Sequence, residues 1–379
     1  MRVLHITNWY PTPGKPKEAI WIKRQIQALA VHLESFHVLH LEVKVSSRFL
    51  FRRYDSPSCT QRVLELPVRT WRIIEMASGV LLVYHLLKLR SYKYDLAMIH
   101  IAYPNLTYCR LVRKLLNVPI AISEHWSAYH FSFGVQNSRK LERIKRIFRQ
   151  GIPVIAVSNA LLSDIANFSG AHFKGYVVPN VVDSQVFALA EERRKERFFM
   201  ASHWKAPKMP LVALEAFKLF IKAYPHFELV VGGYGPDTDK IRNWIDDNGV
   251  SDRIILLGAL EPEEMADQFR SSVAFLHCSD YETFSVVCAE ALCCGTPVIA
   301  SRVGGIAEFV DSTNGFLVNE NSAAAWFNAM NEFMGRYSSF NAPIISQAAC
   351  DRFSADRVGH LCFEALSDVS KWYNKSNDK

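Results

Sequence analysis

The chain has 379 residues, of which 49% are hydrophobic and 21% are charged. A single hydrophobic core stops growing at about 250–300 residues, so this length favours two domains, and the composition excludes an intrinsically disordered chain. The net charge of +7 is unevenly divided: residues 1–190 hold 25 Lys and Arg against 11 Asp and Glu, whereas residues 191–379 hold 19 against 26. We therefore expect only the first half to meet an anionic partner such as a membrane surface.

The cysteines and the apolar segments bear on the compartment. None of the eight cysteines forms a C-x-x-C pair, and most stand in apolar runs, so we expect buried thiols in a reducing compartment and no zinc site. Met1–Ile6 begins directly with a strand pattern and lacks the form of a signal peptide. The most apolar stretch, Met76–Leu89, contains His85 and Lys88 and is too short to span a bilayer. We expect a cytoplasmic protein, either free or peripheral at the cytoplasmic face of the membrane.

Short β-rich runs alternate with longer helical patterns from the first residue onward. In the first half the helical patterns include Ile20–Leu33 and Asn105–Leu116, and the predicted strands are Val3–Ile6, Phe36–Leu41, Leu96–His100, Ile120–Ser123, Val154–Val157 and Gly175–Val178. The second half repeats the scheme, with predicted strands at Arg197–Ala201, Glu228–Gly232, Ile254–Leu257, Val273–His277, Pro297–Ala300 and Gly315–Val318. This alternation predicts an α/β fold with parallel sheets, in two doubly wound domains.

The boundary between the two sets falls near Asn180–Arg197, where the chain enters a charged segment. We expect an N-terminal domain over residues 1–187 and a C-terminal domain over residues 188–354. The tail, residues 355–374, has an amphipathic helical pattern, and we expect it to pack back on the first domain.

The most informative segment runs from Asp280 to Glu308. A strand ends just before it, a loop carries Glu282, and a helix begins near Phe284–Val286 and ends at a glycine followed by a proline. A helix N-terminus after a strand offers N–H groups to an anion such as a diphosphate. Glu290, on the helix, could accept hydrogen bonds from ribose hydroxyls. Two isolated glutamates are as readily solvated surface residues, although the apolar neighbours of Glu290 disfavour that alternative.

This segment resembles the retaining glycosyltransferases of family 4, which have the GT-B fold. Glu282 and Glu290 have the Glu-x7-Glu spacing, and E-A-L-C-C-G-T-P-V-I-A is similar to that family's E-A-x-A-x-G-x-P-V-I-A. The resemblance covers nearly the whole chain and is strongest from residue 154 to 318. Its further matches, in chain order, are Ala156–Ser158, Val178–Asp183, Leu229–Gly235, Leu256–Gly258, Val303–Glu308 and Asn314–Val318.

The resemblance implies two Rossmann-like domains that face a central cleft: an acceptor-side domain, residues 1–187, and a donor-side domain, residues 188–354. A nucleotide-sugar donor is expected between them. Lys208 matches the lysine that binds the donor diphosphate in the family. Glu282 is expected to hold hydroxyls of the transferred sugar, Glu290 the ribose, and Phe284 and Ser285 the phosphates at the helix start. Stabilisation of the leaving nucleoside diphosphate would then be the main catalytic effect.

Two positions depart from the family pattern. His203 stands where the family has an Arg five residues before the Lys, and a neutral imidazole offers one donor where a guanidinium offers five. Lys205 is an alternative phosphate ligand. Ser285 stands where the family often has Gly, and a small side chain still permits close approach of the backbone.

The first half is expected to supply the other wall of the cleft. Gly14 follows the first strand, where the family has a glycine-containing loop near the donor phosphates, although Pro-Gly is also an ordinary turn pair. His125 follows another strand and resembles the family's histidine that approaches the donor sugar, although a lone histidine is more often structural. Together with Lys208 and Glu282, it completes the expected catalytic set. Glu124 is a weaker candidate, for acceptor contact.

The implied reaction is sugar transfer, with retention of anomeric configuration, to a glycan or lipid-linked glycan acceptor, as in capsule, O-antigen or exopolysaccharide assembly. The nucleotide sugar is a substrate, and no cofactor or metal ion is expected. Asp237-Thr238-Asp239 resembles a metal-binding D-x-D pair but fits better as the acidic start of a helix. Two other functions remain open: a nucleotide-sugar epimerase or hydrolase of similar fold, and a non-catalytic nucleotide-sugar sensor.

Basic and apolar residues mix in three segments of the first half: Arg48–Arg53, Arg69–Lys93 and Arg139–Arg149. The last has the pattern of an amphipathic basic helix, which is typical both of an anionic membrane contact and of a solvated basic face. No nucleic-acid-binding module accompanies the charge, so no nucleic-acid partner is expected.

Overall fold

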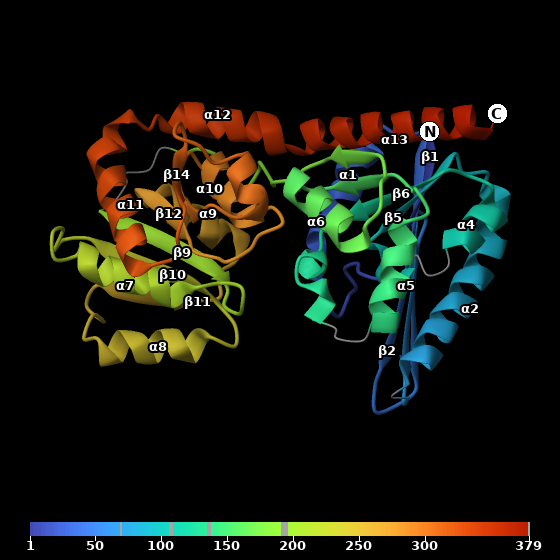
Figure 1. Cartoon of the computed structure of the whole chain (residues 1–379), viewed down its shortest axis with the longest axis horizontal. Helices are drawn as coiled ribbons and strands as arrows, with labels where there is room; N and C mark the ends of the chain where they lie inside the picture. The colour runs from blue at the N-terminus through green and yellow to red at the C-terminus, as the bar shows by residue number, and fades with distance from the viewer. Residues whose placement is uncertain (69, 106–108, 135–137, 191–195, 378–379) are drawn as a thin grey trace. The chain divides into compact units, whose positions relative to one another are not determined.

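The computed structural model describes residues 1–68, 70–105, 109–134, 138–190 and 196–377 (Figure 1). Contacts within the chain divide it into two compact units, Met1–Asn180 with Ala355–Lys379, and Val181–Ser354. The second unit thus begins before the expected residue 188. Residues 191–195, part of the charged segment near the expected boundary, lie outside the described residues.

The first unit is built on an eight-stranded sheet in the order β3-β4-β2-β1-β5-β6-β7-β8. Neighbouring strands are parallel, except that β3 and β4 form an antiparallel hairpin at one edge. The central strands have buried side chains on both faces, which is why they appear in the sequence as short apolar runs. The strands are β1 (Arg2–Thr7), β2 (Ser35–Val45), β3 (Leu50–Ser56), β4 (Cys59–Leu66), β5 (Leu96–His100), β6 (Ile120–Glu124), β7 (Val154–Ala156) and β8 (Gly175–Val177).

The β3–β4 hairpin corrects the sequence analysis, which gave the segment from Arg48 to Arg53 only as a basic surface segment. Seven residues of β3 pair with β4, from Leu50 opposite Glu65 to Ser56 opposite Cys59. The apolar run that predicts the other strands is absent here, because the hairpin lies at the sheet edge and carries Arg and Asp side chains. Charged side chains are common on edge strands because they discourage pairing with other chains.

Helices connect the strands of the first unit, and one of them comes from the far end of the chain. α13 packs against α1, and a Cβ at Gly359 would lie 2.1 Å from the carbonyl oxygen of Ala28, so only glycine permits this approach. Asp368 accepts hydrogen bonds from Lys174 and Tyr176 and ties α13 to the β8 strand. The helices are α1 (Ile20–Ala30), α2 (Trp71–Leu89), α3 (Ala102–Asn105), α4 (Cys109–Leu116), α5 (Ser138–Phe148), α6 (Asn159–Ser169) and α13 (Ala355–Asn377), with short 3-10 turns η1 (Arg90–Tyr92), η3 (Ser127–Tyr129) and η4 (Ser132–Gly134).

The second unit contains a six-stranded sheet in the order β11-β10-β9-β12-β13-β14, and every neighbouring pair is parallel. The carboxyl ends of parallel strands meet at one edge, where ligands of doubly wound folds bind. The strands are β9 (Arg197–His203), β10 (Glu228–Tyr234), β11 (Ile254–Gly258), β12 (Ala274–His277), β13 (Val298–Ser301) and β14 (Gly315–Val318). The helices are α7 (Pro210–Phe220), α8 (Thr238–Asp247), α9 (Pro262–Arg270), α10 (Val286–Cys293), α11 (Ala323–Arg336) and α12 (Ala342–Phe353), with 3-10 turns η5 (Gly304–Glu308) and η6 (Tyr337–Ser339).

Aromatic side chains dominate the core on one face of the second sheet. Phe198 of β9 lies at its centre, with ring centroids 5.2 Å from Phe220 and 5.3 Å from Phe227. Trp326 and Phe333 of α11 are fully buried against the same cluster. This core holds the strand ends, and therefore the site described below, on a rigid base.

The two parallel sheets confirm the predicted α/β fold of Rossmann-like units. The seven cysteines whose side chains are described are unpaired, and five of them are buried. Among the described residues, no helix has the combination of length and apolar character that crossing a membrane requires.

Candidate functional site

Two loops meet at the carboxyl edge of the second sheet. The segment after β9 carries Lys208, whose backbone forms an antiparallel bridge with Ser279, in the segment after β12. Asp280 N donates to the Pro207 carbonyl at 2.9 Å, and Met209 N donates to the Cys278 carbonyl at 3.1 Å. These bonds fix the two segments to each other, so side chains that lie 74 residues apart in the sequence come together.

Lys208 and Glu282 form the centre of the site. Lys208 Nζ donates a hydrogen bond to Glu282 Oε1, and the side chains are 18% and 12% exposed. His277, the last residue of β12, places its Nε2 2.8 Å from the same carboxylate oxygen and therefore donates a hydrogen bond to it. The sequence analysis identified Lys208 and Glu282 but not His277, although its position at a strand end just before the Glu282 loop was a usable signal.

Burial sets the protonation of this cluster. It lowers the pKa of Lys208 to about 8, an effect to which the nearby Lys205 adds, so the amine still carries its proton at pH 7. Burial, and then the charge of Lys208, hold the pKa of His277 well below its ordinary value, so this imidazole is neutral. The cluster therefore presents one ammonium and one carboxylate to an incoming ligand, with a neutral imidazole orienting the carboxylate.

Helix α10 begins beside this cluster. Its N-cap, Ser285, is buried and has φ of 71°, in the left-handed region that favours glycine. The Ser285 side chain does not cap the helix, and its Oγ instead donates to Cys288 Sγ at 3.2 Å. The first-turn N–H groups of an α-helix have no partner inside the helix, so this end can receive an anion. The backbone conformation also explains why the resembling family often has glycine at this position.

Two glycines, Gly304 and Gly305, lie against the backbone of the loop that carries Glu282. Gly305 N donates to the Glu282 carbonyl at 3.0 Å. A Cβ at Gly304 would lie 1.7 Å from that same carbonyl oxygen, and its φ of 47° is also in the left-handed region. A side chain at Gly304 would therefore displace the segment that carries the glutamate.

Three other expected donor-site residues lie in different surroundings. The Phe284 side chain is 3% exposed and packs between Phe309 and Phe353, with centroids 5.2 and 5.4 Å away, so only its backbone remains available to a ligand. Glu290 is half-buried in the second turn of α10. The predicted strand ends at Ala201, whereas β9 extends to the exposed His203, whose ring contacts Tyr234 edge-on at 5.0 Å.

In the first unit, His125 directly follows the end of β6. Its Nδ1 lies 3.1 Å from Asn180 Oδ1, and its Nε2 lies 3.3 Å from Ser123 Oγ. With the amide oxygen facing the ring, Nδ1 carries the proton, whereas the Ser123 hydroxyl donates to Gln25 Oε1 at 3.1 Å. Burial lowers the pKa of His125 to about 4, partly offset by the Asn180 hydrogen bond, so the imidazole is neutral at pH 7.

Gly14 lies in an exposed turn closed by hydrogen bonds between Thr12 and Lys15. A Cβ at Gly14 would meet no atom within 4 Å, so the fold of this unit does not itself require glycine there. Glu124, the weaker candidate for acceptor contact, is fully buried at the end of β6. A residue with no exposed surface does not touch an acceptor, which corrects that expectation.

The D-x-D pair is engaged in ion pairs. Asp237 lies 2.6 Å from Lys240 Nζ, and Asp239 lies 2.7 Å from Arg242. Asp237 is the N-cap of α8 and Asp239 lies in its first turn, where acidic residues complement the helix dipole. Within the described part of the chain, no group of three His, Cys, Asp or Glu residues is arranged to hold a metal ion.

Comparisons with known proteins find similarity to glycosyltransferases. Residues 181–344 match the family model described as glycosyl transferases group 1. The chain is 28% identical over 211 residues to a D-inositol 3-phosphate glycosyltransferase of Paenarthrobacter aurescens, covering 51% of this chain and 52% of that protein. It is 31% identical over 175 residues to an MMP α-(1→4)-mannosyltransferase of Mycolicibacterium hassiacum, covering 45% of this chain and 42% of that protein. The chain spans about half the length of the curated relatives it matches.

Solved structures show the same fold. HepE of Anabaena in complex with UDP aligns over 97% of this chain and 100% of its own, with a TM-score of 0.72 and 17% identity. The lipopolysaccharide outer core galactosyltransferase WaaB in its apo form aligns over 97% and 99%, with a TM-score of 0.72 and 16% identity. Together, these matches show the GT-B fold for this chain and a similarity to the glycosyl transferases group 1 model over residues 181–344.

Proposed function

We propose that this protein is a retaining glycosyltransferase of family 4, which transfers a sugar from a nucleoside diphosphate to a glycan or lipid-linked glycan acceptor. The observation that carries the proposal is the cluster of Lys208, Glu282 and His277 beside the N-terminus of α10, within the segment that matches the group 1 model. Relatives named as inositol phosphate and mannosyl transferases, and a structural neighbour that binds UDP, support a nucleotide-sugar donor.

The residues divide the work of the reaction. The bond between the anomeric carbon and the donor phosphate breaks, and its electron pair goes to the phosphate oxygen. The acceptor hydroxyl oxygen forms the new bond to the anomeric carbon and passes its proton to the departing phosphate oxygen. The Lys208 ammonium and the N–H groups at the start of α10 stabilise the charge on the departing diphosphate. They supply the positive charge there, so the proposal includes no metal ion or cofactor.

Glu282 and Glu290 hold the donor in this proposal. Glu282, oriented by His277, accepts hydrogen bonds from hydroxyls of the transferred sugar, and Glu290 accepts them from the ribose. His203, or Lys205, assists at the phosphates, with backbone N–H groups of Phe284 and Ser285. From the first unit, Gly14 approaches the phosphates and His125 approaches the sugar.

The test is product formation from UDP-, GDP- and ADP-sugars with glycan and polyprenyl-linked glycan acceptors. We expect one donor to be used, and Glu282→Gln to lower kcat by about 10²–10³-fold, the effect of removing a preorganised polar contact. The matched control is Glu263→Gln, on the exposed start of α9. Product without any acceptor would indicate a hydrolase or epimerase, and absence of turnover despite nucleotide binding would indicate a sensor; either result would contradict the proposal.

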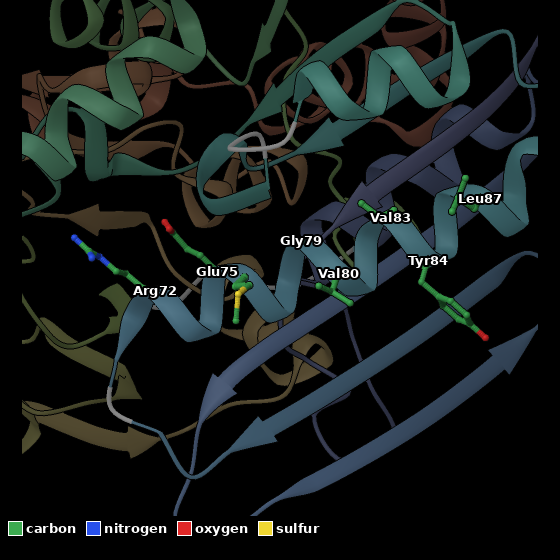
Figure 2. A pocket seen from close by; sticks show the side chains of 8 residues that line it. Arg72, Glu75, Gly79, Val80, Val83, Tyr84 and Leu87 are labelled. Atoms are coloured by element: carbon green, nitrogen blue, oxygen red, sulfur yellow. The ribbon is translucent and has the colours of Figure 1, made fainter.

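We also propose that the enzyme works at an anionic membrane, at the cytoplasmic face, in the assembly of a surface polysaccharide. The support is helix α2, which is apolar around its circumference, with Met76 62%, Val80 64% and Leu87 53% exposed. Figure 2 shows Val80 and Leu87 among the side chains of α2 that line a shallow groove, and Met76 lines it as well. Removing the exposed apolar side chains of such a helix from water, by contact with lipid or protein, lowers the free energy.

Cations surround the same face of α2. Lys88 Nζ lies 4.4 Å from the ring centroid of the exposed Tyr84, and Arg53 and Arg62 act with Lys88 to lower the pKa of that tyrosine. Arg143 of the basic helix α5 is ion-paired with Glu75 of α2 at 2.8 Å, so the predicted amphipathic basic helix adjoins this surface. Apolar side chains ringed by cations match an anionic lipid surface.

Co-sedimentation with vesicles tests this part of the proposal. We expect binding to vesicles that contain phosphatidylglycerol, little binding to pure phosphatidylcholine, and weaker binding of Val80→Ser/Leu87→Ser. The control is Ile344→Ser, an equally exposed apolar residue on α12 of the second unit. Equal binding of both vesicle types, or none, would overturn the membrane assignment and leave the transferase proposal intact.

A further inference from the structure

Glu124 occupies a point where three parts of the first unit converge. It is the last residue of β6 and is fully buried. Its Oε1 accepts a hydrogen bond from the backbone N–H of Ala102, just beyond the end of β5, at 2.6 Å. The same oxygen accepts the hydroxyl hydrogen of Tyr129, in the turn η3. One carboxyl group therefore connects two strand ends and the segment that follows the second of them.

The segment between Glu124 and Tyr129 contains His125 and Trp126. Their backbone N–H groups also interact with the Glu124 carboxylate and favour its charged form. Tyr129 is itself fixed, because its ring packs edge-on against Phe148 at 5.3 Å. The backbone that carries the His125 ring is thus held by a carboxylate at its start and by an immobile tyrosine at its end.

A carboxylate at this fully buried position carries a desolvation cost. Burial raises the pKa of Glu124 to about 7, and the hydrogen bonds from Tyr129 and the backbone only partly offset this effect. An uncharged side chain would avoid the desolvation cost of a buried charge. What the carboxylate adds is an oxygen, Oε1, that accepts from two donors at once, the Ala102 N–H and the Tyr129 hydroxyl.

We propose that Glu124 is a positioning residue, which holds the segment His125–Tyr129 so that the His125 imidazole keeps one orientation and one tautomer during sugar transfer. This inference rests on the proposed function, because it assigns His125 to the sugar side of the reaction. Glu124 touches no substrate and acts through His125. The ionisable groups beside it are Tyr129 from η3 and His125 itself, and His100 from β5 faces His125.

Three variants separate positioning from simple structural support. Glu124→Ala removes all the acceptors, Tyr129→Phe removes one donor, and Glu124→Gln keeps one oxygen but cannot ionise. We expect Glu124→Ala to lower kcat by about 10–100-fold, the effect of a small misplacement of a reacting group, with the KM for the donor unchanged. Tyr129→Phe should lower kcat by a smaller factor than Glu124→Ala. Glu124→Gln should recover part of the loss in kcat and should lack the change in kcat near pH 7 that the wild type shows.

A second measurement does not depend on activity. In protein labelled with ¹³C at the histidine rings, the His125 signal should report the Nδ1–H tautomer in the wild type and in Glu65→Gln, a control that removes a largely buried carboxylate from β4. In Glu124→Ala the signal should shift or broaden. An unchanged His125 signal in folded Glu124→Ala would overturn the inference, and if Glu124→Ala does not fold, an unchanged signal in Glu124→Gln would overturn it. Loss of all transfer activity in the wild type, with the signal behaving as expected, would instead contradict the proposed function alone.

Discussion

The strand ends of the two units carry ionisable groups in opposite states. In the second unit, Lys208 and Glu282 are partly exposed and present charge at the end of the sheet. In the first unit, His5, His100 and Glu124 are fully buried, and burial opposes the charged form of each. A charged, accessible edge suits the binding of a diphosphate, whereas a neutral, buried edge suits the orientation of a ring. The difference therefore predicts that binding and orientation can be disrupted separately.

Among the backbone substitutions, the largest effect is expected at a glycine of the second unit, with a glycine of the first unit as its contrast. Gly304→Ala places a Cβ against the Glu282 carbonyl, so we expect kcat/KM to fall by about 10–100-fold, because the glutamate loop must move. Gly14→Ala adds a Cβ that meets no atom of the first unit, so its folded stability should be unchanged. Steady-state kinetics and thermal unfolding of both variants measure this contrast. A Gly304→Ala enzyme with wild-type kinetics would show that the loop does not position Glu282.

Acid should affect the two units unequally. The pKa of His5 is lowered to about 3 and that of His125 to about 4 by burial, and that of His100 lies well below its ordinary value. The unfolded chain therefore binds protons at these groups first, and the stability present above pH 6.5 is lost as the pH falls toward 4. In the second unit, burial likewise holds the pKa of His277 well below its ordinary value. Limited proteolysis at pH 5, mapped by mass spectrometry, should cut the first unit earlier, and equal cutting would contradict this.

Glu124 should act in the opposite sense. Its folded pKa of about 7 lies above the ordinary value, so its contribution to stability is fully present below pH 4.5 and is lost as the pH rises through 7. We expect Glu124→Gln to be more stable than the wild type at pH 8 and to lose this advantage at pH 5. Urea unfolding at the two pH values measures the difference. A constant difference between the two proteins would show that Glu124 does not titrate in the folded state.

Ser285 gives a smaller effect, on stability. Its left-handed backbone conformation costs a non-glycine residue about 1 kcal/mol or more. Ser285→Gly should relieve this and raise the Tm by about 2–4 °C for a unit of this size, with activity retained. Calorimetry measures the change, and Ser354→Gly, at a C-cap with φ of −59°, is the control that should not gain. A decrease in Tm for Ser285→Gly would mean that the hydrogen bond to Cys288 outweighs the strain.

The parts of the fold and of the candidate site that could be predicted from the sequence are those whose signal lies in neighbouring residues. Buried parallel strands such as β5 and β12 form apolar runs, and the loop-to-helix change around Glu282 carries its own turn and cap residues, so both are visible in the sequence. The β3–β4 hairpin was missed because its edge strand is charged. The burial of Phe284 and the convergence on Glu124 were not predicted, because their partners come from distant parts of the chain. His277 lies only five residues from Glu282, so its signal was local but was not used.

The smallest effect is expected at His203. His203→Arg restores the residue of the family pattern and adds charged donors at an exposed strand end. If His203 assists at the donor phosphates, the nucleoside diphosphate should bind about two- to ten-fold more tightly, the gain of one net hydrogen bond. Lys222→Arg, in the exposed turn that follows α7, is the control. Unchanged binding would assign the phosphate contact to Lys205 or Lys208 instead.

The most direct test of the donor site is calorimetric titration of UDP, GDP and ADP into the wild type, Lys208→Met and Lys205→Met. We expect one nucleotide to bind and to stabilise the fold by about 2.7 kcal/mol at a hundred times its Kd. Lys208→Met should abolish this binding, because it removes the ammonium beside the start of α10, and Lys205→Met should weaken it less. Binding of no nucleotide by the wild type, or full binding by Lys208→Met, would contradict the assignment of this strand edge as the donor site.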